Sequence, residues 1–173
     1  MLSINGSSKT TSFMDIKLGR SSLTKNGVKK GEEFIASRKA KDEATISASL
    51  GFVVCGYVIL DKQGVKTDSG YKTHKQVTED KVCETLKKIL SDDEGKLIPE
   101  VKQAVLDKLN AFRLVFEDVK LVLRGASAFI TVDKVAKTVG VHLIDLNSIE
   151  LVDAPDQDLV YGITTLAKYV EKC

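Results

Sequence analysis

Apolar residues alternate with small or polar ones along residues 44–54. A period of two is typical of a β-strand that buries one face and exposes the other. Beyond Gly51 both faces become apolar as far as Leu60, as in a strand that runs beneath other elements. The pattern therefore predicts one long central strand over residues 44–60, in which glycines would allow a bend or a bulge.

Shorter patterns on either side of this strand predict an antiparallel meander. We expect strands over residues 13–20 and 32–40. Asn26-Gly27, a dipeptide that favours tight turns, lies between them. Residues 65–72 are more polar and carry lysine, as edge strands often do. About four strands are thus expected before the first helix.

Two apolar stripes at helical spacing predict a helical block after the meander. Thr78 can cap the first helix, whose first turn is acidic, and Pro99 suits the first turn of the second. The stripes are Val82, Leu86, Ile89 and Leu90 in the first helix and Val101, Val105, Leu109 and Phe112 in the second. We expect both stripes to face the core.

From Arg113 onward the period returns to two and predicts further strands. The predicted strands cover residues 114–123, with a bulge at Glu117-Asp118, and then 128–132, 139–146 and 149–152. Pro155, set among acidic residues, indicates the start of a last helix. Its apolar stripe consists of Leu159, Ile163, Leu166 and Val170.

The order of elements predicts an α+β fold with two antiparallel β-meanders of about four strands, each followed by a helical segment. We expect a single domain over residues 13–173 after a disordered tail over residues 1–12, which is rich in Ser, Thr, Asn and Gly. No apolar run reaches the roughly 20 residues of a membrane helix, so no membrane association is expected. The start of the chain lacks the apolar segment of a secretory signal.

Motifs for catalysis or metal binding are missing from the sequence. Cys55, Cys83 and Cys173 lie far apart, as do the two histidines, so we expect no metal site and a reducing, cytoplasmic location. His142 alternates with apolar neighbours, which favours a strand residue over a general base. Glycine-rich phosphate loops are absent. The sequence thus predicts no enzyme activity, no catalytic residue and no cofactor.

Positive charge is concentrated near the N-terminus. Residues 1–42 hold nine Lys or Arg against four acids, whereas the whole chain carries a net charge of only +2. A basic arm of this kind attracts a polyanion, and it equally suits a solvated tail kept soluble by lysine. The candidate phosphate contacts are Lys17, Arg20, Lys25, Lys29, Lys30, Arg38, Lys39 and Lys41. Tyr57 and Tyr71 are candidates for stacking on a base.

The order of strands and helices resembles that of the Whirly, PUR and mitochondrial RNA-binding-protein group, from about residue 12 onward. This resemblance implies a Whirly-like homo-oligomer that binds single-stranded DNA or RNA along its sheets. Combined with the basic segment, it predicts a non-catalytic protein that binds single-stranded nucleic acid, RNA in preference to DNA, with low sequence specificity. The alternative is a viral or phage structural subunit, such as a coat, tube or matrix-like protein, because a flexible basic arm also serves genome packaging.

Overall fold

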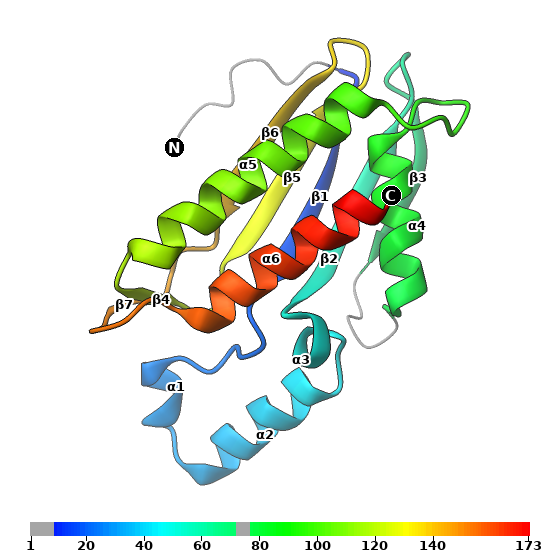
Figure 1. The fold of residues 1–173 in the computed structure, drawn as a ribbon. Helices are drawn as coiled ribbons and strands as arrows, with labels where there is room; N and C mark the ends of the chain where they lie inside the picture. Colours follow the sequence, from blue (N-terminus) through cyan, green and yellow to red (C-terminus); the bar gives the residue numbers. More distant parts are fainter. Residues whose placement is uncertain (1–8, 72–76) are drawn as a thin grey trace.

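The computed structural model describes residues 9–71 and 77–173, and its centre is one five-stranded antiparallel sheet (Figure 1). The strands follow the order β3-β2-β1-β5-β6 across the sheet. Their bounds are β1 Thr11–Leu18, β2 Phe52–Leu60, β3 Lys66–Tyr71, β5 Ser127–Asp133 and β6 Thr138–Ile144. A separate ribbon pairs β4 (Leu121–Leu123) with β7 (Ile149–Leu151).

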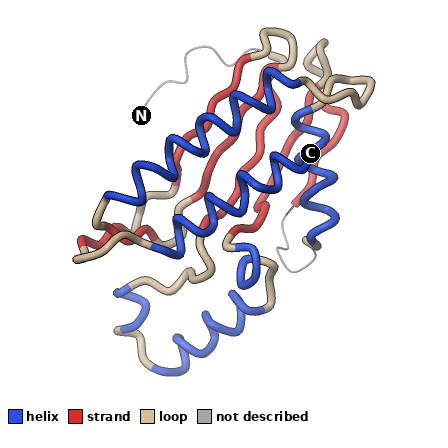
Figure 2. The backbone as a smooth tube through the Cα atoms, in the orientation of Figure 1, coloured by secondary structure: helices blue, strands red, loops and turns tan. Residues whose placement is uncertain are grey.

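Helices cover one face of this sheet and also form an excursion at one end of it (Figures 1 and 2). The covering helices are α4 (Glu79–Leu90), α5 (Pro99–Asp118) and α6 (Gln157–Lys172). The excursion connects β1 to β2 and contains α1 (Lys25–Val28), α2 (Glu32–Glu43) and α3 (Ser47–Leu50). Within the described ranges, no helix is long and apolar enough to cross a membrane.

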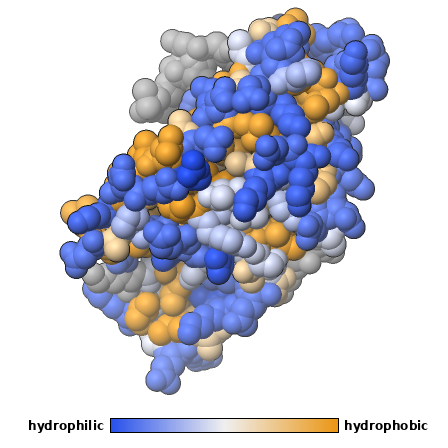
Figure 3. Space-filling model, in the orientation of Figure 1, coloured by the Kyte–Doolittle hydropathy of each residue, from blue (hydrophilic) through white to orange (hydrophobic). Residues whose placement is uncertain are grey.

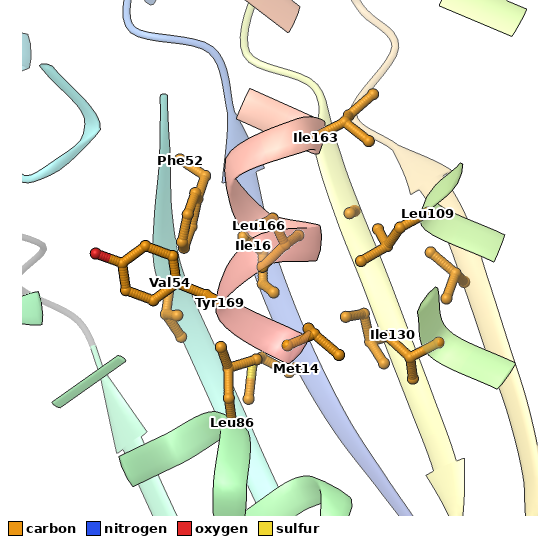
Figure 4. Close-up of a cluster of buried hydrophobic side chains, with 14 of the residues drawn as sticks. Met14, Ile16, Phe52, Val54, Leu86, Leu109, Ile130, Ile163, Leu166 and Tyr169 are labelled. Carbon is orange, nitrogen blue, oxygen red and sulfur yellow. The ribbon is translucent and has the colours of Figure 1, made fainter. Parts of the chain in front are cut away.

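The core lies between β1 with its neighbours and the three covering helices. Met14, Ile16 and Leu18 alternate along β1 and are at most 2% exposed. Figure 4 shows the first two of these side chains beneath Leu86 of α4 and Leu166 of α6. Each such burial stabilises the fold by about 1.5–3 kcal/mol, so this layer is the main source of stability.

The helix predictions at Thr78 and at the last helix are confirmed. Thr78 caps α4 by accepting a hydrogen bond from the amide of Lys81, and Asp156 caps α6. Every predicted stripe residue of these two helices is buried, and β3 lies at the sheet edge as expected. In α5 the stripe is buried except for Phe112, which packs against the core from its margin.

The predicted strand over residues 44–60 is wrong in its first half. Ala44 ends α2, Ser47–Leu50 forms α3, and only Phe52–Leu60 is a strand. Ile46 and Leu50 fit an alternating pattern, but they are also four residues apart, which places both on one side of a helical turn. Both pack against the core, so tertiary burial favours the helix.

Two further predicted strands are helical, at residues 32–40 and 114–118. The first is α2, in which no residue is buried, and the second is the last part of α5. Phe116 falls seven residues after Leu109, two helical turns along the same stripe, and both are buried. The apolar run Leu114-Val115 looked like a strand, but these side chains are exposed on α5.

The strand pairing also corrects the predicted architecture. An α+β fold is confirmed, but two consecutive meanders are not, because β1 pairs with β5 and joins both halves of the chain in one sheet. The Whirly-like topology is therefore wrong. β1 already begins at Thr11, and the part of the predicted tail over residues 1–8 lies outside the described residues.

Exposed apolar side chains gather at one end of the helix-bearing face (Figure 3). They are Leu114 and Val115 on α5 and Ile149 and Leu151 on β7, the last of them 88% exposed.

A close backbone crossing fixes α6 against the excursion. The amide of Gly19 donates to the carbonyl of Gly51 (2.7 Å), and Gly51 has a φ of +72°, which glycine adopts without strain. A side-chain carbon at Gly162 of α6 would overlap the Gly51 carbonyl. The hydroxyl of Tyr161 donates to the Ser49 carbonyl (2.9 Å) beside this crossing.

We predict that Gly162→Ala lowers the free energy of unfolding by about 1–3 kcal/mol, because the added methyl group forces α6 away from Gly51. Glycine-to-alanine changes inside helices normally stabilise by about 0.5–1 kcal/mol, so the expected sign is the reverse of the usual one. Urea unfolding measures the effect, and Lys168→Ala on the same helix is the control. Unchanged or increased stability of Gly162→Ala would show that the crossing has room to spare.

Candidate functional site

Asp15 and Lys17 lie two residues apart on the face of β1 that is turned away from the covering helices. Lys17 pairs with Val53 on β2 and with Ser127 on β5. A side-chain carbon at Gly125, just before β5, would lie 3.9 Å from the Lys17 amine. The ammonium group therefore extends toward the end of the sheet where β5 begins.

The Asp15 carboxylate has an unusual environment. Its Oδ1 is the only buried side-chain nitrogen or oxygen in the described part of the chain that lacks a hydrogen-bond partner. A buried acceptor without a partner costs about 1–3 kcal/mol, and native proteins rarely retain one without a functional reason. This oxygen is available to accept a proton or to bind a cation.

A β-bulge in β2 lies beside these two residues. Asp15 is opposite Gly56 and Ile16 is opposite Val54, so Cys55 is the extra residue. Bulges often occur next to active sites, where they redirect a side chain. Burial raises the pKa of the Cys55 thiol to about 11, and the negative charge of Asp15 adds to this effect.

Two further charges near Cys55 affect the pKa of its thiol. A backbone hydrogen bond at Lys17 and the charge of that lysine act to lower its pKa, and Asp145 acts to raise it. Asp145 directly follows β6 and has a φ of +60°, which is uncommon for a residue with a side chain. We call Asp15, Lys17, Ser127 and Asp145, grouped around Cys55, the strand-end site.

Two aromatic rings extend the same sheet face beyond Asp15. Phe13 of β1 and Phe129 of β5 stack with ring centroids 5.5 Å apart. Their centroid separation falls in the range of favourable aromatic pairs, so they form a flat apolar surface next to the charged residues. His142 is the partner of Phe129 on β6.

The basic excursion, which we define as residues 20–50, starts directly beyond the strand-end site. Asp158 at the start of α6 fixes the first residues of the excursion. Its carboxylate accepts hydrogen bonds from the amides of Arg20 (3.0 Å) and Ser21 (3.3 Å). The Arg20 side chain pairs with the same carboxylate at 3.3 Å and lies over the ring of Tyr161. α6 thus positions the excursion relative to β1.

The sequence candidates for phosphate contact are split between these two regions. Lys17 belongs to the strand-end site, and the others lie on the excursion: Arg20 at its entry, Lys29 and Lys30 after α1, and Arg38, Lys39 and Lys41 on α2. Lys25 begins α1 and Tyr71 ends β3, but their side chains lie outside the described part of the structure. Tyr57 packs against the core and is not placed for stacking on a base.

Most cations in the described part of the excursion have no acidic partner. Lys30 and Arg38 lie over the ring of Phe34, at 4.8 and 5.6 Å from its centroid. In residues 9–71 and 77–173, neither Lys29 nor Lys39 forms an ion pair. These positive charges are consequently free to attract an anion.

Comparison with known proteins identifies the family. The model of the family described as inositol polyphosphate kinase matches residues 4–171, nearly the whole chain. The chain belongs to the inositol polyphosphate kinase family. No curated protein matches the chain.

Solved structures of family members share the fold. One comes from structural studies and protein engineering of inositol phosphate multikinase, and it gives a TM-score of 0.80 at 18% identity. The alignment covers 94% of the present chain and 79% of the chain in that structure. Another is the inositol phosphate multikinase Ipk2 of S. cerevisiae in complex with ADP and Mn²⁺. It gives a TM-score of 0.75 at 19% identity, with 99% and 81% of the two chains covered.

Membership in this family corrects the functional predictions. A non-catalytic protein that binds single-stranded RNA or DNA, a viral or phage subunit, and the absence of enzyme activity are all contradicted. The homo-oligomer was implied by the Whirly resemblance and loses its basis with it. The cytoplasmic location and the boundary of the domain at residue 13 stay predictions.

Sequence reasoning overlooked both carboxylates of the strand-end site. The alternating patterns predict Asp15 and Asp145 only as polar positions within strands. The available signal was Asp15-Ile16-Lys17, since two opposite charges on one strand face are costly in a core and so indicate a site. Nothing in the sequence alone indicated that Asp145, 130 residues later, would join them.

We predict that the strand-end charges control the reactivity of Cys55. Asp15→Asn removes a negative charge, lowers the pKa of the thiol from about 11 and so speeds its alkylation at pH 9, because more thiolate is present. Lys17→Gln removes a positive charge and slows alkylation. Rates are measured by mass spectrometry in a Cys83→Ser, Cys173→Ser background. Equal rates in both variants would show that these charges do not surround Cys55.

Proposed function

We propose that this protein is a kinase that transfers a phosphoryl group from a nucleoside triphosphate to a hydroxyl group of an inositol phosphate. The family supports this reaction class, and so does the yeast relative, whose structure holds ADP and Mn²⁺. The observation that carries the proposal is the partnerless carboxylate oxygen of Asp15, on the same strand face as Lys17. Phosphoryl transfer depends mainly on positioning and on stabilising negative charge, which this pair can supply.

Asp15 and Lys17 have defined roles in the proposed reaction. Asp15 accepts the proton of the attacking inositol hydroxyl as that oxygen bonds to phosphorus. Lys17 contacts the transferred phosphoryl group and offsets the charge that develops on its oxygens. The bond from phosphorus to the bridging oxygen of the nucleotide breaks, and the diphosphate leaves.

The site also fits a divalent cation of the kind seen in the yeast relative. Among the described residues, no cluster of three or more His, Cys, Asp or Glu could hold a metal ion by itself. Mg²⁺ and similar ions are commonly bound by one or two carboxylates with nucleotide phosphates completing the coordination. Asp145, exposed at the same end of the sheet, would hold such an ion, which when bound neutralises phosphate charge.

The basic excursion is suited to bind the inositol phosphate. An inositol ring with several phosphates needs several cations, and Lys29 and Lys39 of the excursion form no ion pair with a described residue. Because the excursion begins three residues after Lys17, it can bring phosphates close to the strand-end site. The residues predicted to contact nucleic-acid phosphates are thus proposed to contact substrate phosphates instead.

The test of the activity is incubation with ATP, Mg²⁺ or Mn²⁺ and a panel of inositol phosphates, followed by anion-exchange separation of the products. We expect at least one inositol phosphate to gain a phosphate. ATP without inositol phosphate is the control for simple hydrolysis. A folded protein that phosphorylates none of the panel would overturn the proposed function.

We predict that Asp15→Asn lowers kcat by about 10²–10⁴-fold, because the amide cannot accept the hydroxyl proton. The KM for ATP should change little, since Asp15 is not proposed to bind the nucleotide. Asp153→Asn, which changes an exposed acid outside the site, is the matched control. A kcat reduced equally in both variants would remove Asp15 from the mechanism.

We predict that reversing the charge of Arg38 and Lys39 to Glu raises the KM for the inositol phosphate at least about tenfold, in line with the loss of charge-assisted contacts. α2 has no buried residue, so the melting temperature should be nearly unchanged. Lys108→Glu, on the exposed side of α5, is the control. Kinetics that match wild type would place the substrate elsewhere.

A further inference from the structure

Two of the three cysteines lie close to each other at the C-terminal end of α6, far from the strand-end site. Cys83 lies on α4 and Cys173 directly follows α6, 90 positions later in the sequence. Figure 1 shows the end of α6 beside α4. We propose that Cys83 and Cys173 form a reversible disulfide when the protein meets a low-molecular-weight disulfide such as oxidised glutathione.

The geometry brings the two residues within reach of each other. The Cys173 sulfur lies 3.9 Å from the backbone oxygen of Cys83 and 3.2 Å from that of Tyr169. Since a carbonyl oxygen lies about 2.4 Å from its own Cα, the sulfur is within about 6 Å of the Cys83 Cα. Disulfides join residues whose Cα atoms are about 4.4–6.8 Å apart, so the bond requires rotation of the side chains and a movement of Cys173 at the end of α6 toward α4.

Neighbouring contacts keep the end of α6 in this place. The hydroxyl of Tyr169 donates to the carboxylate of Glu79 at the start of α4. The Lys102 amine of α5 donates to the backbone oxygen of Glu171 at 2.8 Å. The two residues are therefore held near each other before any bond forms, and this proximity favours the internal disulfide over two separate adducts.

Both thiols are free and only half-buried, so a small reagent can reach them. Burial and the proximity of Cys83 raise the pKa of the Cys173 thiol, whereas Lys87 and Lys102 oppose that effect. Cys55 differs from this pair because it lies in the β2 bulge at the strand-end site. It has no cysteine next to it among the described residues, and it serves as an internal control.

The bond would form by two thiol–disulfide exchanges. The thiolate of one cysteine attacks a sulfur of the small disulfide, which gives a mixed disulfide and releases one small thiol. The thiolate of the second cysteine then attacks the protein sulfur of that mixed disulfide and releases the second small thiol. The protein loses two protons and two electrons, and the reagent gains both.

The disulfide would join α6 to α4 without touching the strand-end site. It closes a loop of about 90 residues, and closing so long a loop restricts the unfolded chain. We expect the melting temperature to rise by about 5–10 °C on oxidation. Reduction with dithiothreitol should reverse the rise.

The experiment treats the full chain with oxidised glutathione and follows intact mass, non-reducing peptide maps and thermal unfolding. The proposal predicts a Cys83–Cys173 cross-linked peptide, the loss of two hydrogens and the rise in melting temperature. Cys55→Ser should behave as wild type, whereas Cys83→Ser and Cys173→Ser should form no cross-link and show no rise. Glutathione adducts without the cross-link, or a rise that persists in Cys173→Ser, would overturn the proposal.

Discussion

β1 is hydrogen-bonded along both edges, to β2 and to β5. Its side chains alternate between the face that packs against the helices and the opposite face of the sheet. The inward residues Met14 and Ile16 anchor the layer of helices, and they are fully buried. The outward residues Asp15 and Lys17 lie on the same rigid backbone, one position away from core residues. The positions of the charged groups are therefore set by core packing, which is the most stable part of the structure.

The basic excursion depends on this strand in a different way. It has little core of its own, since α2 buries nothing, and it is held at its ends. Asp158 binds the entry through Arg20 and Ser21, and the Gly51–Gly162 crossing holds the exit. A segment fixed at both ends but loosely packed between them can adjust to a polyanionic ligand while the strand-end site stays in place.

The sequence was informative where local chemistry and tertiary burial agree. The caps at Thr78 and Asp156 and the stripes of α4 and α6 were predictable because cap, charge and period all indicate a helix there. Residues 44–50 were misread because Ile46 and Leu50 satisfy both periods, and only packing against the core selects the helix. The pairing of β1 with β5 links positions more than 100 residues apart, and no local pattern contains that information.

Several unusual local features lie together at the strand-end site. Asp15 keeps a buried oxygen without a partner, Asp145 has a left-handed backbone, and Cys55 is held in a bulge with a raised pKa. A buried acceptor without a partner and a left-handed backbone each cost about 1–3 kcal/mol, which a marginally stable protein retains only where the surrounding structure enforces it. The cation and the phosphate group of the proposed reaction would satisfy the partnerless oxygen of Asp15 and the charge of Lys17. The charged groups that are costly to place on the sheet are thus the ones that the proposed reaction uses.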